Sequence, residues 1–357
     1  MQFTSEEREF LESLISTPSP VGYEAAGQRV WLEHIREASD EVITDLYGSA
    51  AAKISINEKA PTVMLEAHCD EIGMVVQYIG DKGFIYINRI GGSDPTIARA
   101  RRVNIHTRKG IVSGIIGHVA IHLQNRDNQK SPSWKDLFID IGVSSREEAQ
   151  ELVQVGDPIT YADDFEFISE DLLAGRAIDN RIGGFIIAHA FKKLAAEKEK
   201  LNVNVVALNA VQEEVGGHGA RMMAYRLNAD MALVTDVTHA TDSPGINPKE
   251  HGLVKLGGGP VVSHGGANQV KLVEKVVSAA EKADITIQHE ATSGRTGTDT
   301  DVIFYAKSGI ASTLISTPMR YMHTPHEMVS MEDVWNLSRL MQETVKSLSR
   351  GENLMPV

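Results

Sequence analysis

The chain has 357 residues, of which 42% are hydrophobic, so it is long enough to bury a large core and to form two domains. Its 48 acidic residues outnumber its 35 basic residues, and the formal net charge of -13 argues against nucleic acid or an anionic membrane as a partner, since both bind clustered lysine and arginine. The single cysteine, Cys69, excludes an intramolecular disulfide, and the lack of a signal-peptide pattern or of a ~20-residue apolar run favours a cytoplasmic protein.

The first predicted elements are helices. Thr4 and Glu7 have the spacing of a capping box, and the apolar residues that follow predict a helix over residues 4–15. A second helix is expected at 28–38, and the apolar run at 62–67 predicts a buried strand.

The pattern changes between residues 72 and 167. Short alternating or β-branched runs separated by glycine predict strands at 73–79, 84–90, 102–107 and 111–119, with one helix at 145–153. This block is typical of a small β-barrel.

From residue 172 onward, strands and helices alternate as in a doubly wound α/β sheet. We expect helices at 182–198, 220–227, 267–283, 301–307 and 331–348, and strands at 202–210, 231–235, 285–290 and 312–316. The early strand at 62–67 needs partners, so we expect it to join this later mixed sheet. The predicted architecture is a catalytic α/β domain made of residues 1–70 and 168–357, interrupted by an inserted β-barrel domain at 71–167.

Polar residues follow the predicted strands of the α/β part. Ligands of open α/β sheets bind beyond the carboxyl ends of the strands, so these positions are candidates for a site. Each of them alone is more often a cap, a turn or a core histidine. Together they form a set that would meet at one edge of the sheet: His68, Asp70, Asp179, Glu213, Glu214, Asp236 and His323.

Such a set points to metal ions, because burying several unpaired polar groups is costly unless a cation compensates. Histidine and carboxylate ligands without cysteine suit zinc, with cobalt and manganese as alternatives. A catalytic zinc keeps about three protein ligands, so the larger set suits two divalent ions about 3.5–4 Å apart.

Spacing within the motifs suggests separate roles. His68 and Asp70 are two residues apart on extended backbone, so Asp70 can accept the second imidazole N–H. Cys69 points the other way and is expected in the core. Of the adjacent Glu213 and Glu214, one can bind metal while the other acts as general base.

These motifs resemble the tetrahedral aminopeptidases, a family that includes glutamyl and deblocking aminopeptidases and proteins labelled endoglucanase M-like. The resemblance runs nearly end to end, with small departures at Cys69 and Gly184 that replace no ligand. It is carried, in order, by residues 66–73 (EAHCDEIG), 177–183 (AIDNRIG), 212–216 (QEEVG), 235–237 (TDV), 294–299 (GRTGTD) and 320–327 (RYMHTPHE).

The resemblance implies a role for each candidate. His68 and Asp236 would hold one ion, Glu214 and His323 the other, and Asp179 would bridge them. It also implies that Glu213 is the general base for a bridging water and that Asp70 orients His68.

At the level of the whole protein, the resemblance implies peptide substrates with a free N-terminus. It further implies dimers that assemble into a tetrahedral dodecamer with the active sites facing an interior chamber.

Other functions fit the same residues less well. There is no Gly-x-Ser-x-Gly elbow, Walker loop or complete dinucleotide motif, and His326-Glu327 lacks the second histidine of a single-zinc His-Glu-x-x-His site. The main alternative is a glycoside hydrolase that uses Glu213 with another carboxylate, but it leaves His68 and His323 unexplained. A non-enzymatic binding module is a weaker alternative, because a full ligand set and a base are present.

Lys255, Arg295 and Arg320 could favour an acidic substrate side chain, although structural roles are commoner for such residues.

Overall fold

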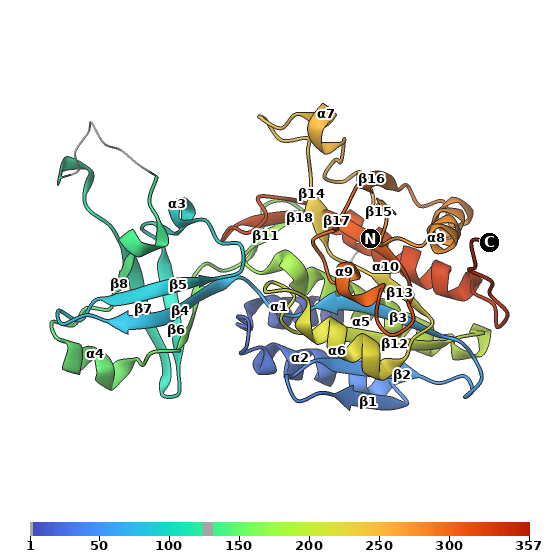
Figure 1. The fold of residues 1–357 in the computed structure, drawn as a ribbon, viewed down its shortest axis with the longest axis horizontal. Helices are drawn as coiled ribbons and strands as arrows, with labels where there is room; N and C mark the ends of the chain where they lie inside the picture. Colours follow the sequence, from blue (N-terminus) through green and yellow to red (C-terminus); the bar gives the residue numbers. More distant parts are fainter. Residues whose placement is uncertain (1–2, 124–130) are drawn as a thin grey trace.

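The computed structural model describes residues 3–123 and 131–357. Figure 1 shows a layered α/β body and, beside it, a smaller part made mostly of strands, with the short helices α3 (Pro95–Ala98) and α4 (Arg146–Leu152). The chain enters this part after β3 (Thr62–His68) and leaves it before β10 (Glu166–Phe167). This confirms the predicted mixed α/β fold with a β-barrel. Residues 124–130, inside the predicted insertion, lie outside the described part of the chain.

The body is built on a 12-stranded mixed sheet. Its main order is β1-β2-β12-β3-β13-β17-β18-β11-β10, with β14 and β15 pairing with β17, and β16 with β15. The strands of this sheet are β1 (Glu41–Thr44), β2 (Ala50–Ile54), β3 (Thr62–His68), β10 (Glu166–Phe167), β11 (Leu172–Gly175), β12 (Asn204–Ala210), β13 (Met231–Val234), β14 (Val237–His239), β15 (Val261–Gly265), β16 (Gln288–Thr292), β17 (Ala311–Arg320) and β18 (Glu327–Ser330).

Helices cover both faces of the sheet, as the burial of every residue of β12 requires. Val205 and Ala207 pack into the core with α1, α2, α5, α8 and α10, whereas Val206 and Leu208 pack with α6 and α9 on the other face. The helices are α1 (Ser5–Ser16), α2 (Ala25–Ile35), α3 (Pro95–Ala98), α4 (Arg146–Leu152), α5 (Ile178–Ala196), α6 (His218–Leu227), α7 (Pro248–His251), α8 (Val270–Lys282), α9 (Thr300–Ile303) and α10 (Met331–Ser347). Among the described residues, no helix is long and apolar enough to cross a membrane.

The smaller part is a closed barrel in the order β4-β5-β8-β7-β6-β9. Its interior is a separate apolar core that includes Met74, Ile105 and Ile139. The strands are β4 (Gly73–Ile79), β5 (Ile85–Ile90), β6 (Arg102–Thr107), β7 (Gly110–Gly117), β8 (Phe138–Asp140) and β9 (Pro158–Tyr161).

Most predicted elements are present, and the differences have local causes. The helix predicted at 301–307 is only the single turn of α9, because the chain reverses at Lys307 and Gly309, which both have positive φ. The strand predicted at 285–290 is displaced to β16 after a left-handed Asp284. The hairpin β1–β2 and the strands β8, β9, β10, β11, β14, β15 and β18 were not predicted, since short strands carry little periodicity.

Candidate metal centre

Parallel pairing brings three of the strand-end motifs to one edge. β3 pairs in parallel with β12 on one side and β13 on the other, with His68 opposite Ala210 and Glu66 opposite Val234. The three strands therefore end together, and the residues that follow β12 and β13 lie beside His68. Glu213, Glu214 and Asp236 reach the site in this way.

Asp179 and His323 lie in segments that connect to other strands of the same sheet. Asp179 is near the start of α5, directly after β11, where its backbone (φ -75, ψ 110) is not yet helical. His323 is in the turn between β17 and β18, with a left-handed backbone (φ 61). The structure therefore places all five predicted metal ligands around one point.

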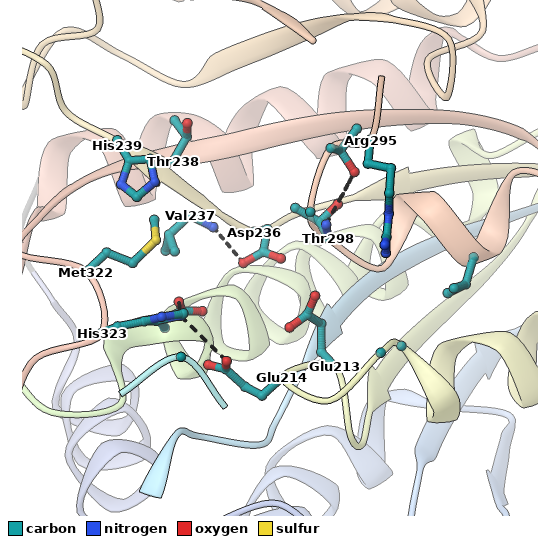
Figure 2. Close-up of a pocket in the computed structure, with 17 residues that line it drawn as sticks. Glu213, Glu214, Asp236, Val237, Thr238, His239, Arg295, Thr298, Met322 and His323 are labelled. Atoms are coloured by element: carbon teal, nitrogen blue, oxygen red, sulfur yellow. Dashed lines mark hydrogen bonds and ion pairs between the residues drawn. The ribbon is translucent and has the colours of Figure 1, made fainter. Parts of the chain in front are cut away.

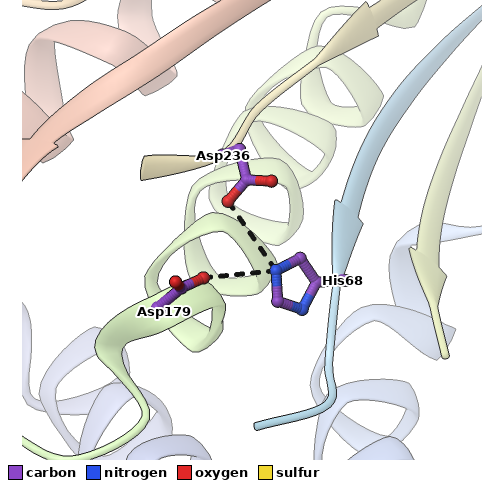
Figure 3. A group of neighbouring side chains, drawn as sticks. All are labelled: His68, Asp179 and Asp236. Atoms are coloured by element: carbon purple, nitrogen blue, oxygen red, sulfur yellow. Dashed lines mark ion pairs between the residues drawn. The ribbon is translucent and has the colours of Figure 1, made fainter. Parts of the chain in front are cut away.

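The five side chains form two groups that share one residue. Nε2 of His68 lies 3.2 Å from Oδ1 of Asp179 and 3.7 Å from Oδ1 of Asp236 (Figure 3). Nε2 of His323 lies 3.3 Å from Oδ2 of Asp179 and 3.5 Å from Oε2 of Glu214. In each group the potential ligand atoms are all within 4.8 Å of one another, so the two oxygens of Asp179 face different groups.

Glu213 belongs to neither group but points into the same cavity. Its Oε2 is 3.9 Å from Nε2 of His68. Figure 2 shows the carboxylates of Glu213 and Glu214 extending from one loop into this cavity, which has a volume of about 550 Å³. The cavity is large enough to admit an amino-acid side chain and its neighbouring peptide group.

Burial and repulsion between neighbouring carboxylates shift the pKa values of the site residues. Burial raises the pKa of Glu213 and Glu214 well above the usual range, and neighbouring carboxylates add to the effect. Burial also raises the pKa of Asp236. Burial disfavours the charged form of His68, but its contacts with Asp179 and Asp236 outweigh this and raise its pKa. Without further positive charge, the site holds its acidic residues at a considerable energetic cost.

The residues fit divalent cations by their donor atoms and by one buried oxygen without a hydrogen bond. Oε1 of Glu214 is buried without a hydrogen-bond partner in the described part of the chain. The donors are imidazole nitrogens and carboxylate oxygens, which suit zinc, cobalt or manganese.

Two buried carboxylates hold the backbone of the site residues. Asp70 accepts the N–H groups of Glu213 (3.0 Å) and Glu214 (3.1 Å), while its Oδ1 lies 3.5 Å from Nδ1 of His68. Glu327 accepts the N–H groups of Asp179 and His323. The glycines after Glu214 allow the tight turn, since Gly217 has a positive φ.

The contacts of Glu327 were not predicted from the sequence, where His326-Glu327 is only an incomplete zinc motif. In the structure the His326 side chain is half exposed and contacts Arg101. A signal was available: Glu327 and Val329 share a face of β18, and Val329 is fully buried. An acidic residue on a buried strand face indicates a specific role.

The other residues considered from the sequence have different locations in the structure. Cys69 is buried in the core, as expected from its direction. Arg320 is bound by Asp242 through two contacts of 3.1 and 2.7 Å, whereas Arg295 lines the cavity and Lys255 does not. Gly92, Thr238, His239 and Met322 also line the cavity and were not singled out from the sequence.

Known proteins resemble this chain over nearly its whole length. The lysyl aminopeptidase of Pyrococcus furiosus is 31% identical over 344 residues, which cover 95% of this chain and 97% of that protein. A TET aminopeptidase from a marine sediment Thaumarchaeota archaeon has a TM-score of 0.92 at 33% identity, covering 96% of this chain and 97% of that chain. The Pyrococcus horikoshii TET1 peptidase, described as able to assemble into a tetrahedron or a large octahedral shell, has a TM-score of 0.84 at 29% identity, covering 96% of this chain and 100% of that chain.

The sequence model of the M42 glutamyl aminopeptidases matches residues 48–340, which include every candidate ligand. The match confirms the resemblance to tetrahedral aminopeptidases, and this chain belongs to the M42 glutamyl aminopeptidase family.

Proposed function

We propose that this protein is an aminopeptidase that removes N-terminal residues from peptides with the help of two divalent metal ions. Zinc is the first choice, with cobalt and manganese as alternatives. Family membership supports aminopeptidase activity. The shared position of Asp179 is the observation that carries the two-metal proposal, because its two oxygens face two separate histidine–carboxylate groups.

The proposed roles follow the two groups. His68 and Asp236 would hold one ion, Glu214 and His323 would hold the other, and Asp179 would contribute to both, since it belongs to both groups. When bound, the ions polarise the peptide carbonyl and lower the pKa of the attacking water. Glu213 takes the proton from that water and delivers it to the leaving amine, since it is the carboxylate in the cavity that neither group uses.

The test is the substitution Glu213→Gln, which keeps the shape of the side chain and removes its basic oxygen. Both metal ions should remain bound, while kcat falls by about 10²–10⁴-fold because proton transfer is lost. Metal content by elemental analysis and turnover of aminoacyl amides are the measurements. Glu281→Gln, at an exposed position of α8, is the matched control. Near-normal turnover in Glu213→Gln would remove Glu213 from this role.

The glycoside hydrolase alternative makes a different prediction. It uses two carboxyl groups and no metal, and therefore gives no reason for His68 and His323 to face Asp179. Treatment with a chelator should abolish hydrolysis of aminoacyl amides, and adding the metal back should restore it. Cellulose hydrolysis that survives metal removal would favour the alternative.

We further propose that the chains assemble as dimers into a tetrahedral dodecamer. The likeness to the TET1 peptidase supports a homo-oligomer. Sedimentation should give a mass near twelve times the 39.0 kDa of one chain. A monomer at working concentration would contradict the assembly.

A further inference from the structure

Glu327 lies between the two chain segments that supply Asp179 and His323. Its side chain is almost completely buried, with the residue 1% exposed. Oε2 accepts the backbone N–H of Asp179 at 3.0 Å, and Oε1 accepts the backbone N–H of His323 at 2.9 Å. Each oxygen thus holds one residue of the candidate metal centre.

The strand order explains how Glu327 reaches this position. β18 is hydrogen-bonded between β11 and β17, with Gly175 opposite Glu327 and Met319 opposite Val329. β11 leads directly into the start of α5, and β17 leads into the turn that carries His323. Strand pairing therefore fixes Glu327 between β11 and β17, the two strands that lead to Asp179 and His323.

Neither of these two N–H groups donates a hydrogen bond within a helix or a sheet; both donate to Glu327. Asp179 precedes the helical part of α5 and lies two residues after Ala177, which has a left-handed backbone (φ 57). His323 also has a positive φ of 61, which is unusual for a residue other than glycine. The two oxygens of Glu327 satisfy these two N–H groups, so the side chain stabilises both conformations.

We propose that Glu327 is a positioning residue that fixes Asp179 relative to His323 and so shapes the cation position that these two residues form with Glu214. This role rests on the proposed two-metal function and adds to it a residue that would touch neither metal nor substrate. Asp70 acts in the same way on another segment of the site, because it accepts the backbone N–H groups of Glu213 and Glu214. The site is then held by two buried carboxylates, each binding two backbone N–H groups.

The substitution Glu327→Gln separates this role from simple packing. The amide keeps the size of the side chain but turns one acceptor oxygen into a donor, which faces a backbone N–H and leaves it unsatisfied. The group with Glu214 should weaken more than the group with His68, because it contains both residues that Glu327 holds.

A matched control exists at Asp333. This residue is fully buried and also accepts two backbone N–H groups, those of Gly257 and Gly259, both at 2.7 Å. None of these residues belongs to the candidate centre. Asp333→Asn therefore makes the same chemical change, with a comparable loss of stability, at a position without a metal ligand.

The experiment titrates full-length protein with zinc against a competing chelator and counts bound ions by elemental analysis. Wild type should bind two ions. E327Q should bind the second ion about 10–100-fold more weakly, the range found when partners of metal ligands are removed, and D333N should bind both as wild type does. Thermal unfolding of the metal-free forms shows whether the two variants lose similar stability.

Activity provides a second readout. In E327Q, kcat at stoichiometric zinc should fall and recover at excess zinc with an unchanged KM, which a general loss of stability would not produce. If E327Q does not fold, Glu327→Asp serves in the same titration, since its shorter carboxylate reaches only one of the two N–H groups. It should show a smaller loss of affinity.

The outcomes distinguish the two proposals. Equal zinc affinity in wild type and E327Q would overturn the role of Glu327 and leave the proposed function standing. Equal weakening in E327Q and D333N would also overturn it, because the effect would then be one of stability. Wild-type protein that binds no divalent ion would overturn the two-metal function itself.

Discussion

Three basic residues that could recognise an acidic substrate have different surroundings. Arg320 is bound by Asp242, and the hydrogen bonds raise its pKa. Lys255 does not line the cavity. Arg295 lines it, and its Nε contacts the carboxylate of Asp301 at 3.2 Å, while 82% of the side chain is exposed. Its guanidinium group is therefore available to a ligand in the cavity.

We expect Arg295→Ala to lower kcat/KM for substrates with N-terminal glutamate about 10-fold relative to leucine. A charged hydrogen bond would be lost, and its value is reduced at an exposed site. A panel of aminoacyl amides measures the ratio. Arg295→Lys, which keeps the charge, should retain part of the preference, and an unchanged ratio in Arg295→Ala would exclude recognition by this residue.

At the scale of elements, the barrel contributes directly to the candidate centre. The loop after β5 brings Gly91 and Gly92 against the site residues. A Cβ atom at Gly92 would lie 2.4 Å from Nδ1 of His323, and one at Gly91 would lie 3.0 Å from Oε2 of Glu214. The absence of side chains at Gly91 and Gly92 lets the body and the barrel approach each other there.

Gly92→Ala should therefore displace the ring of His323 and weaken binding of the ion that His323 holds. The expected loss is about 10-fold or more in zinc affinity, because a small displacement of a ligand is costly to a metal site. Gly266→Ala is the control, since its Cβ would contact nothing within 4 Å. Unchanged affinity in Gly92→Ala, measured by chelator competition, would show that the loop can move aside.

At the scale of the whole molecule, two partly buried histidines link the stability of the fold to pH. Burial lowers the pKa of His34, which stacks on Phe10, to about 4. Burial also lowers the pKa of His189 to about 4. Both are therefore neutral in the folded protein at a pH where an unfolded histidine, with a pKa near 6.5, begins to gain a proton.

At these two histidines the unfolded state consequently binds more protons between pH 6.5 and 4, so their contribution to the free energy of unfolding should fall as pH decreases through this range. The buried carboxylates of the candidate centre, whose pKa values are raised, act in the opposite direction. Urea unfolding at several pH values measures the slope. His34→Gln should reduce the slope, whereas His251→Gln, at an exposed position, should leave it unchanged. An identical slope in His34→Gln and wild type would contradict the assignment.

Local sequence determined much of this molecule. The capping box of Thr4 and Glu7 starts α1, and the apolar run before His68 forms the buried β3. Residues that follow parallel strands must meet at one edge, so the convergence of His68, Glu214 and Asp236 is predictable from the order of strands and motifs along the chain. Strand propensity, capping and parallel pairing depend on neighbouring residues and on general rules of packing.

Only the tertiary structure decided how the site is held. The sequence does not show that the two oxygens of Asp179 face different histidines, nor that Gly92 of the barrel loop meets His323. Glu327 binds the N–H of Asp179, 148 positions away in the chain, because β18 lies between β11 and β17. Such contacts arise from the order of strands in the completed sheet, which no local pattern encodes.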